Sequence, residues 1–200
     1  MDRPSVRESY RRHVRGLILE SAYELAVAKG WDKVRMSEIA ERAGASRALL
    51  YKVFGDKASL GDALLLREAD RFLAGIHLEL ERHRSDAAAG ISAAVQFTLS
   101  EAERSPLLKA VLISHRDATD QPLGVLPLLT TSFTLLERST EVLVGWFMES
   151  FPELDRTDVD DAADALVRLT VSHLALPNAD MNTTGRQITE VALRYLGLRS

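Results

Sequence analysis

The basic side chains of the first 60 residues are the groups best placed to do chemistry, and their partner would be a polyanion. Residues 1–60 hold 12 Lys and Arg against 8 Asp and Glu, a net charge of +4, whereas residues 61–200 carry −8. Arginine bonds guanine through two donors, and Lys and Tyr bond phosphate oxygens. The asymmetry favours a nucleic-acid-binding front on an acidic body, with a chance distribution of charge as the alternative.

The residues suited to nucleic acid gather between positions 35 and 57. We predict a helix from about Ser37, its N-cap, to Ala43, a break at Gly44, and a second helix capped by Ser46 and ending near Phe54. This is a helix-turn-helix pattern, with a plain hairpin of solvated charges as the alternative. The candidate DNA contacts are Arg35, Ser37, Ala45, Ser46, Arg47, Ala48, Leu49, Tyr51, Lys52 and Lys57.

Each part of this pattern has an expected role. Leu50 and Phe54, four residues apart, would hold the second helix on the core, and Ala40 and Gly44 would be small where two helices cross closely. Arg47 would reach base edges, and Tyr51 would reach phosphates together with Lys52. Lys57, in the first turn of the next helix, would form a phosphate clamp.

The whole chain has helical rather than strand-like periodicity, which predicts an all-α fold. Capping residues, glycines and prolines predict about nine helices, near residues 6–29, 37–43, 46–54, 57–83, 86–102, 106–115, 132–151, 158–176 and 184–198. Pro122 and Pro127 bound a broken stretch, Thr157 or Asp158 opens the eighth helix, and Thr184 caps the last.

Several classes of protein are disfavoured by composition. The chain has no cysteine, which excludes disulfides and thiolate chemistry, and it has no apolar run of the roughly 20 residues needed to span a bilayer. The charged N-terminus lacks a signal-peptide core, so we expect a cytoplasmic protein without a membrane partner. We expect no cofactor and no enzyme activity, because no phosphate-binding glycine loop or nucleophile elbow is present.

Two polar clusters have ordinary explanations. His77 and Glu81 lie one helical turn apart but lack a third metal ligand at matching spacing, so a solvated helix face is favoured. Four carboxylates at Asp158, Asp160, Asp161 and Asp164 open a predicted helix, where acidic residues interact favourably with the helix dipole. We therefore expect neither cluster to form a metal or catalytic site.

The run GWDKVRMSEIAERAGASRALLYKVFGDKASL resembles the N-terminal domain of the tetracycline-repressor (TetR) family. The matching positions are Gly30-Trp31, Ile39-Ala40, Ala43-Gly44-Ala45-Ser46, Leu50-Tyr51, Phe54, Lys57 and Leu60. Three residues depart from the family pattern: Ala45 replaces a common Val, Leu49 a small or hydroxylated residue, and Val53 a phosphate-contacting His or Tyr. Leu49 would touch a thymine methyl or pack on the neighbouring helix.

The resemblance implies a homodimeric regulator, most often a repressor, that binds a palindromic double-stranded operator. The third helix of each protomer would enter one of two successive major grooves. It implies a DNA-binding domain over residues 1–56 and a ligand-sensing and dimerisation domain over 57–200, with the helix at 57–83 linking them. An arm containing Arg3, Arg7, Arg11 and Arg12 would add phosphate or minor-groove contacts, or would be a frayed terminus. The alternative function is a helical dimeric adaptor that has lost DNA binding.

The C-terminal helices would carry the dimer interface and the effector pocket. The last two would form a four-helix bundle with their twins, or pack within one protomer, through Val159, Ala163, Leu166, Val167, Thr170, Leu174, Ile188, Val191, Ala192, Tyr195 and Leu196. The resemblance implies that a small-molecule effector releases the protein from its operator, and a mostly apolar pocket would suit a lipophilic one. The candidate residues lining this pocket are Phe97, Leu112, His115, Phe133, Leu136, Leu143, Trp146, Phe147 and His173. Simple core packing is the alternative for each of these residues.

Overall fold

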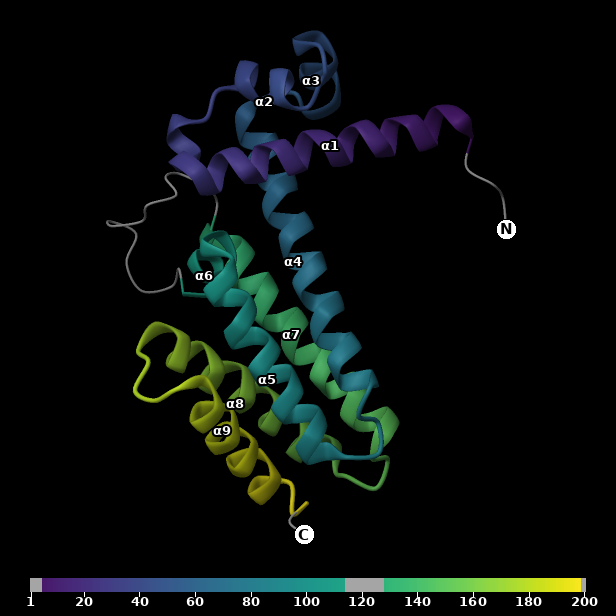
Figure 1. The fold of residues 1–200 in the computed structure, drawn as a ribbon. Helices are drawn as coiled ribbons and strands as arrows, with labels where there is room; N and C mark the ends of the chain where they lie inside the picture. Colours follow the sequence, from purple (N-terminus) through teal and green to yellow (C-terminus); the bar gives the residue numbers. More distant parts are fainter. Residues whose placement is uncertain (1–4, 114–127, 199–200) are drawn as a thin grey trace. The chain divides into compact units, whose positions relative to one another are not determined.

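The computed structural model describes residues 5–113 and 128–198, and the side chains of these except Val6, Ala110, Ile113 and 128–133. These ranges contain helices and no strand, which confirms the all-α prediction (Figure 1). The helices are α1 Val6–Lys29, the 3-10 turn η1 Trp31–Lys33, α2 Met36–Arg42, α3 Arg47–Phe54, α4 Lys57–Glu81, α5 Ala87–Arg104, α6 Pro106–Ile113, α7 Leu128–Ser150, α8 Arg156–Ala175 and α9 Met181–Tyr195.

Several helix ends lie where the sequence places them. α1 ends before Gly30, whose φ of 82° is readily adopted only by glycine. α3 begins after Ser46, whose Oγ accepts the Leu49 N–H at 3.1 Å. Asp56 and Asp86 cap α4 and α5, each through Oδ1 and the backbone N–H three residues on. These ends were predictable because a short polar side chain satisfies an unpaired N–H at the first turn.

Other caps differ from the prediction because a different residue reaches the free N–H groups. α2 begins at Met36, so Arg35 occupies the N-cap position and Ser37 lies inside the helix. α8 is capped by Asp155 rather than Thr157 or Asp158. α9 is capped by Asp180, whose Oδ1 accepts from Asn182 and Thr183 at 3.0 Å each. Thr184 is only 3% exposed inside this helix, so it is not the predicted cap.

The remaining differences concern α6 and α7. α7 begins at Leu128, four residues before the predicted start at Ser132. α6 is described as far as Ile113, so its predicted end at His115 lies outside the described residues. The stretch containing Pro122 and Pro127 lies outside them as well.

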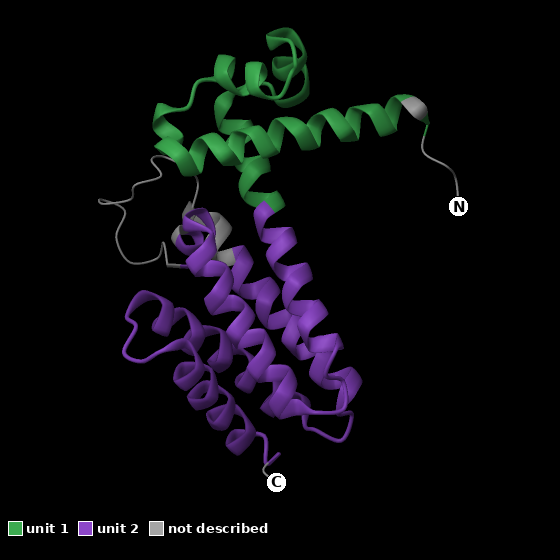
Figure 2. Ribbon diagram, viewed as in Figure 1, with its two compact units in different colours: residues 1–67, 117–128 green, residues 68–116, 129–200 purple. Residues whose placement is uncertain are grey.

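The described residues divide into two compact units (Figure 2). Unit 1 contains residues 5–67, together with Leu128, and unit 2 contains residues 68–113 and 129–198. The division falls within α4, which contributes its first turns to unit 1 and the rest to unit 2. Unit 1 therefore holds the predicted helix-turn-helix, and unit 2 holds most of the helices expected to bind an effector and a second copy.

Each unit has its own apolar core. In unit 1, buried Ile18, Trp31 and Ile39 bring together α1, η1 and α2. In unit 2, α5 packs closely on α9 and also contacts α6 and α8. Gly90 of α5 admits the Trp146 ring, because a Cβ there would lie 2.6 Å from Cζ2 of the indole. Across the described residues, no helix is long and apolar enough to cross a membrane.

Candidate functional site

The turn between α2 and α3 places the second helix of the motif. Gly44 has φ 63°, and its N–H donates to Glu41 O while the Ala45 N–H donates to Ala40 O. This pair of bonds forms a Schellman motif, which ends a helix through a left-handed residue. A Cβ at Gly44 would meet nothing within 4 Å. Glycine is therefore required here for its φ, and the predicted close crossing of helices at Gly44 is wrong.

Buried contacts hold α3 in place. Leu50 is fully buried and Phe54 is 7% exposed, as their four-residue spacing predicts. The Arg15 guanidinium of α1 lies 4.7 Å from the centre of the Phe54 ring. Such cation–π contacts are attractive and would fix α1 against the end of α3. The helix is thereby presented with one face on the core and the opposite face free.

A polar contact joins α1 to α2. Lys29 Nζ donates to both carboxylate oxygens of Glu38 at 2.7 Å, and Glu38 also accepts the Arg35 N–H at 2.9 Å. The Lys29 hydrogen bond, followed by the Arg35 backbone hydrogen bond, lowers the pKa of Glu38 below its ordinary value. The carboxylate thus closes the first turn of α2 and anchors it to the end of α1.

The free face of α3 carries the side chains expected to contact DNA. Arg47, Ala48 and Lys52 are exposed, and Tyr51 is 51% exposed. Leu49 is half-buried on the side that faces α1. Arg47 makes no hydrogen bond or ion pair with any described residue, so its guanidinium donors are available. An unpaired Arg at the start of an exposed helix is suited to the major groove of DNA.

Some of the other predicted DNA contacts are already engaged within the protein or partly buried. Lys57 Nζ donates to Asp32 O at 3.1 Å and lies 5.3 Å from the centre of the Trp31 ring. Ser46 Oγ accepts the cap hydrogen bond, which leaves its hydroxyl hydrogen available to an acceptor such as phosphate. Ser37 and Ala45 are half-buried. Arg35 is exposed, as are Arg7, Arg11 and Arg12 of the expected arm, whereas Arg3 lies outside the described residues.

Several carboxylates of the two polar clusters that were not expected to bind a metal form ion pairs with nearby arginines. Glu81 binds Arg84 at 2.7 Å, and this hydrogen bond lowers the pKa of Glu81. Asp160 pairs with Arg156 and Asp164 with Arg168 one turn away, and Asp161 accepts the Tyr195 hydroxyl at 3.3 Å. The described residues contain no group of three His, Asp or Glu able to hold a metal ion.

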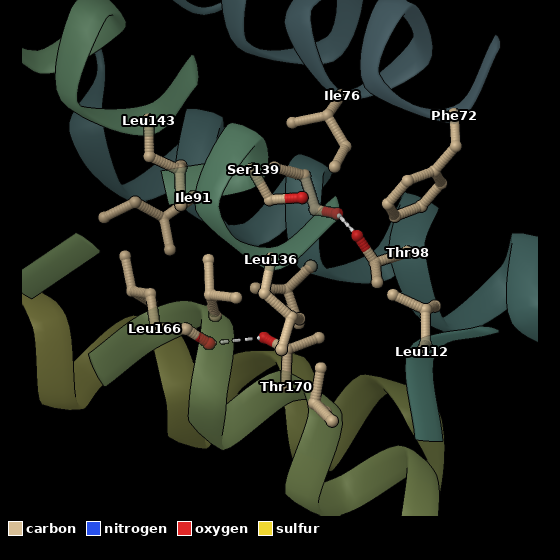
Figure 3. A pocket seen from close by; sticks show the side chains of 14 residues that line it. Phe72, Ile76, Ile91, Thr98, Leu112, Leu136, Ser139, Leu143, Leu166 and Thr170 are labelled. Carbon is tan, nitrogen blue, oxygen red and sulfur yellow. Dashed lines mark hydrogen bonds between the residues drawn. The ribbon is translucent and has the colours of Figure 1, made fainter. Parts of the chain in front are cut away.

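Unit 2 contains an apolar cavity of about 40 Å³ (Figure 3). Among the described residues, no charged side chain lines it, and three hydroxyls do. Each hydroxyl donates to the carbonyl four residues back: Thr98 to Ala94, Ser139 to Leu135 and Thr170 to Leu166. The described part of the lining therefore has no hydroxyl without a hydrogen bond. Known ligand pockets are about 300–1,000 Å³, so a ligand has to displace side chains to enter.

Part of the predicted pocket lines this cavity. Leu112, Leu136 and Leu143 do so, and Phe97, Trp146 and Phe147 pack elsewhere in unit 2. Half-buried His173 has Nδ1 3.2 Å from Leu169 O and does not line the cavity. His115 and the Phe133 side chain lie outside the described residues. The lining residues missed from the sequence are Phe72, Ile76, Ile91, Ala94, Val95, Thr98, Ser139, Leu166, Val167, Thr170 and Val171.

The predicted dimer stripe is mostly internal to the protomer. The buried members are Val159, Ala163, Leu166, Val167, Thr170, Leu174, Ile188, Ala192 and Leu196, each at most 9% exposed. Their burial agrees with the alternative that the stripe packs within one protomer, because α8 and α9 use these side chains to pack on each other and on α5. Their assignment to the interface stays a prediction. Val191 and Tyr195 are 52% and 54% exposed.

Comparison with known proteins matches both units to one group of regulators. Residues 18–64 match the family described as bacterial regulatory proteins, tetR family. Residues 86–194 match the bacterial tetracyclin repressor C-terminal domain.

Three relatives illustrate the match. The HTH-type transcriptional regulator AlkX of Mycobacterium tuberculosis is 26% identical over 193 residues, covering 94% of this chain and 89% of that protein. The HTH-type transcriptional activator FasR of Mycolicibacterium smegmatis is 38% identical over 82 residues, covering 41% of this chain and 37% of that protein. The crystal structure of a TetR-family repressor, AlkX, from a Dietzia species, implicated in biodegradation of n-alkanes, superposes with a TM-score of 0.66 at 28% identity. It covers 91% of this chain and 97% of that one.

Proposed function

Because this chain belongs to the TetR family of bacterial transcriptional regulators, we propose that it is a homodimeric repressor released from a palindromic operator by a lipophilic effector. Residues 1–56 would bind DNA, and residues 57–200 would sense the effector and dimerise. The observation that carries the DNA-binding part is the exposed Arg47 at the start of α3, which has no partner among the described residues. Buried Leu50 and Phe54 support it from the core side of the helix.

In this proposal α3 of each protomer enters a major groove. Arg47 bonds a guanine edge through two donors, while Tyr51 and Lys52 bond phosphate oxygens of the flanking strand. Ala48 is exposed next to Arg47 and leaves room for a base-pair edge or a thymine methyl. Lys57 holds the start of α4 on Trp31 and Asp32, so it would position the head and would meet phosphate only after releasing those contacts.

Binding to duplexes that tile the DNA flanking the protein's own gene tests this assignment. We expect Arg47→Ala to weaken binding by about 1–3 kcal/mol and to relax discrimination between the operator and a scrambled duplex. Tyr51→Phe should weaken binding less, because only a hydroxyl is lost. Arg42→Ala is the matched control, since it removes the same charge from a side chain already paired with Glu24 at 3.0 Å.

The outcomes separate the regulator from the adaptor. Unchanged affinity in both Arg47→Ala and Tyr51→Phe would remove these side chains from the DNA interface. Failure of the wild-type chain to bind any duplex at low salt would support the adaptor instead, since electrostatic DNA binding is strongest there. A reporter fused to the operator decides between repression and activation: we expect transcription to rise on deletion of the gene.

The proposed dimer uses the outer face of α8 and α9. Val191 and Tyr195, one turn apart on α9, are each more than half exposed and form an apolar and aromatic pair on the surface of this helix. We expect the wild type to sediment as a dimer at micromolar concentration and Val191→Asp to shift it to monomer. Leu78→Asp on α4, another exposed apolar position at 51%, is the matched control and should stay dimeric.

The proposed effector occupies the unit 2 cavity with an uncharged hydrocarbon portion. The described residues of its lining offer no charge and no free hydroxyl, and a buried unpaired charge would cost on the order of several kcal/mol. The link of the Dietzia AlkX to n-alkane degradation supports this ligand class. Binding would favour a dimer whose recognition helices no longer match the groove spacing.

A cavity-filling variant tests the effector site. We expect n-decane to release the operator from the wild type and to release it far less from Ala94→Leu, whose added carbons occupy the cavity lining. Operator binding without n-decane should be the same in both proteins. Equal release from the two would place the ligand elsewhere.

A further inference from the structure

Two buried polar atoms of α7 have no hydrogen-bond partner among the described residues. They are the indole Nε1 of Trp146 and Oγ of Ser150. Trp146 is only 2% exposed, so its N–H is shielded from the solvent at the surface. A buried donor without an acceptor is costly, and nearly all such groups in proteins are bonded by protein, water or ligand. These two atoms therefore indicate an occupant that supplies an oxygen.

The two atoms belong to one face of α7, which also borders the unit 2 cavity. Trp146 and Ser150 are one turn apart, and Leu143, which lines the cavity, lies one turn before Trp146. Residues spaced by three, four and seven positions share a face of a helix. Ser150 is about 10 Å beyond Leu143 along the helix axis, at a rise of about 1.5 Å per residue. The Trp146–Ser150 pair thus continues the α7 wall of the cavity toward the end of this helix.

α5 places the same indole next to the cavity. Gly90 leaves room for the Trp146 ring, since a Cβ there would lie 2.6 Å from Cζ2, which is two bonds from Nε1. The residue after Gly90, Ile91, lines the cavity. Figure 3 shows Ile91 close to Leu143, on the side of the pocket opposite Phe72. The Trp146–Ser150 pair therefore lies beyond the end of the cavity that Ile91 and Leu143 form.

The surroundings of the pair favour an uncharged partner. Arg84, which contacts the end of α7, already donates to Glu81 at 2.7 Å and to Glu149 at 3.0 Å. An anionic group would compete with Glu149 for this arginine, and burying an unpaired charge is costly. A hydroxyl has no charge, and it can accept the Trp146 N–H while donating its own hydrogen to Ser150 Oγ. One hydroxyl thus satisfies both atoms.

We propose that the Trp146–Ser150 pair binds the hydroxyl of a straight-chain alcohol whose hydrocarbon chain occupies the unit 2 cavity. This inference rests on the proposed effector site and narrows its ligand class. The chain lies against Leu143 and Ile91, and the hydroxyl bonds the two atoms beyond them. An alkane fills the cavity but leaves Nε1 and Oγ unpaired, so the pair distinguishes an alcohol from the alkane of the same length.

The indole N–H signal of Trp146 tests the contact directly in the full-length protein. The chain has two tryptophans, Trp31 and Trp146, so Trp146→Phe assigns the two indole signals. We expect 1-decanol to shift the Trp146 signal and n-decane to shift it far less. A signal unmoved by 1-decanol up to its solubility limit would overturn the proposal. So would a cross-peak from water to this N–H that persists in 1-decanol, because the pair would then hold a buried water.

Operator release separates the hydroxyl from the chain of the ligand. Trp146→Phe keeps an aromatic ring and Ser150→Ala keeps the Cβ, and each removes one polar atom. Relative to n-decane, each should raise the 1-decanol concentration for half-release by about 3- to 10-fold, the effect of one buried hydrogen bond. Ser139→Ala is the matched control, since its hydroxyl already donates to Leu135 O at 2.8 Å. It should change the two ligands' concentrations alike.

The outcomes distinguish the alcohol site from the proposed function. Equal changes for 1-decanol and n-decane in both Trp146→Phe and Ser150→Ala would overturn the alcohol site. A response to decanoate as strong as that to 1-decanol, with the same dependence on Trp146, would overturn the uncharged ligand class. If 1-decanol shifts the Trp146 signal while the wild-type protein stays on its operator, the alcohol site stands and the proposed release by an effector fails instead.

Discussion

The two units use polar groups in opposite ways. In unit 1, Arg7, Arg11 and Arg47 are exposed and have no partner among the described residues. In unit 2, the three hydroxyls that line the cavity among the described residues donate to backbone carbonyls, and no charged side chain in that part of the chain lines the cavity. Unpaired surface charge is suited to a charged macromolecule, whereas a fully satisfied apolar cavity lining is suited to a hydrocarbon chain. Variants of the two units should therefore affect different properties of the protein.

The largest effect on stability is expected from Phe147→Ala in unit 2. Phe147 is fully buried and packs against Trp146 with ring centres 4.9 Å apart, so truncation leaves a cavity and should lower the free energy of unfolding by about 3–5 kcal/mol. Urea denaturation at fixed protein concentration, followed by far-UV circular dichroism, measures the change. Arg47→Ala in unit 1 should stay within about 0.5 kcal/mol of the wild type. Equal destabilisation by the two would contradict the division of roles.

A smaller effect is expected where a glycine of unit 2 gives room to a ring. A Cβ at Gly75 would lie 2.1 Å from Cζ of Phe97, so Gly75→Ala must displace that ring and should cost about 1–3 kcal/mol. Gly145 is exposed in α7 and a Cβ there meets nothing within 4 Å. Gly145→Ala should therefore stabilise the helix by about 0.5–1 kcal/mol. Thermal unfolding of both variants measures the difference, and shifts of the same sign would show that Phe97 yields without cost.

The sequence is informative about unit 1 because its signals are local. Ser46 and Asp56 cap the helices that follow them, and Leu50 and Phe54 face the core at helical spacing. The predicted role of Gly44 was wrong. A glycine at a turn is needed either because two helices cross closely or because the backbone has a positive φ, and only the structure distinguishes the two reasons.

The sequence is less informative about unit 2 because its cavity depends on packing between distant segments. Leu166 and Thr170 fit an apolar stripe that faces either a partner protein or the protomer's own core, and helical periodicity is the same in both cases. Aromatic residues were favoured as pocket candidates, yet Phe97 and Trp146 instead fill the space left by Gly75 and Gly90. Whether a side chain lines the cavity or fills space elsewhere depends on which distant residues it contacts, and no local sequence pattern specifies those contacts.

The smallest effect is expected from Glu38→Gln, which removes a charge from the contact between α1 and α2. Hydrogen bonds from Lys29 first, and from the Arg35 backbone second, lower the pKa of Glu38 in the folded protein. A carboxyl group whose folded pKa is lowered stabilises the fold above its unfolded pKa, about 4.3 for Glu. That contribution is lost as the pH falls through the lower, folded value. Stability of Glu38→Gln should therefore be below wild type at neutral pH and should approach it in acid.

Fluorescence of Trp31 can follow this effect in unit 1. Trp31 and Trp146 are the two tryptophans, so Trp146→Phe leaves Trp31 as the only one. This substitution removes no hydrogen bond within the described residues, because Trp146 Nε1 has no partner among them. In the Trp146→Phe background, adding Glu38→Gln should lower the urea midpoint at neutral pH and leave it nearly unchanged in acid. Glu41→Gln, whose carboxylate makes no hydrogen bond within the described residues, is the matched control. A difference that persists unchanged into acid would assign the contact to packing of the Glu38 side chain rather than to its charge.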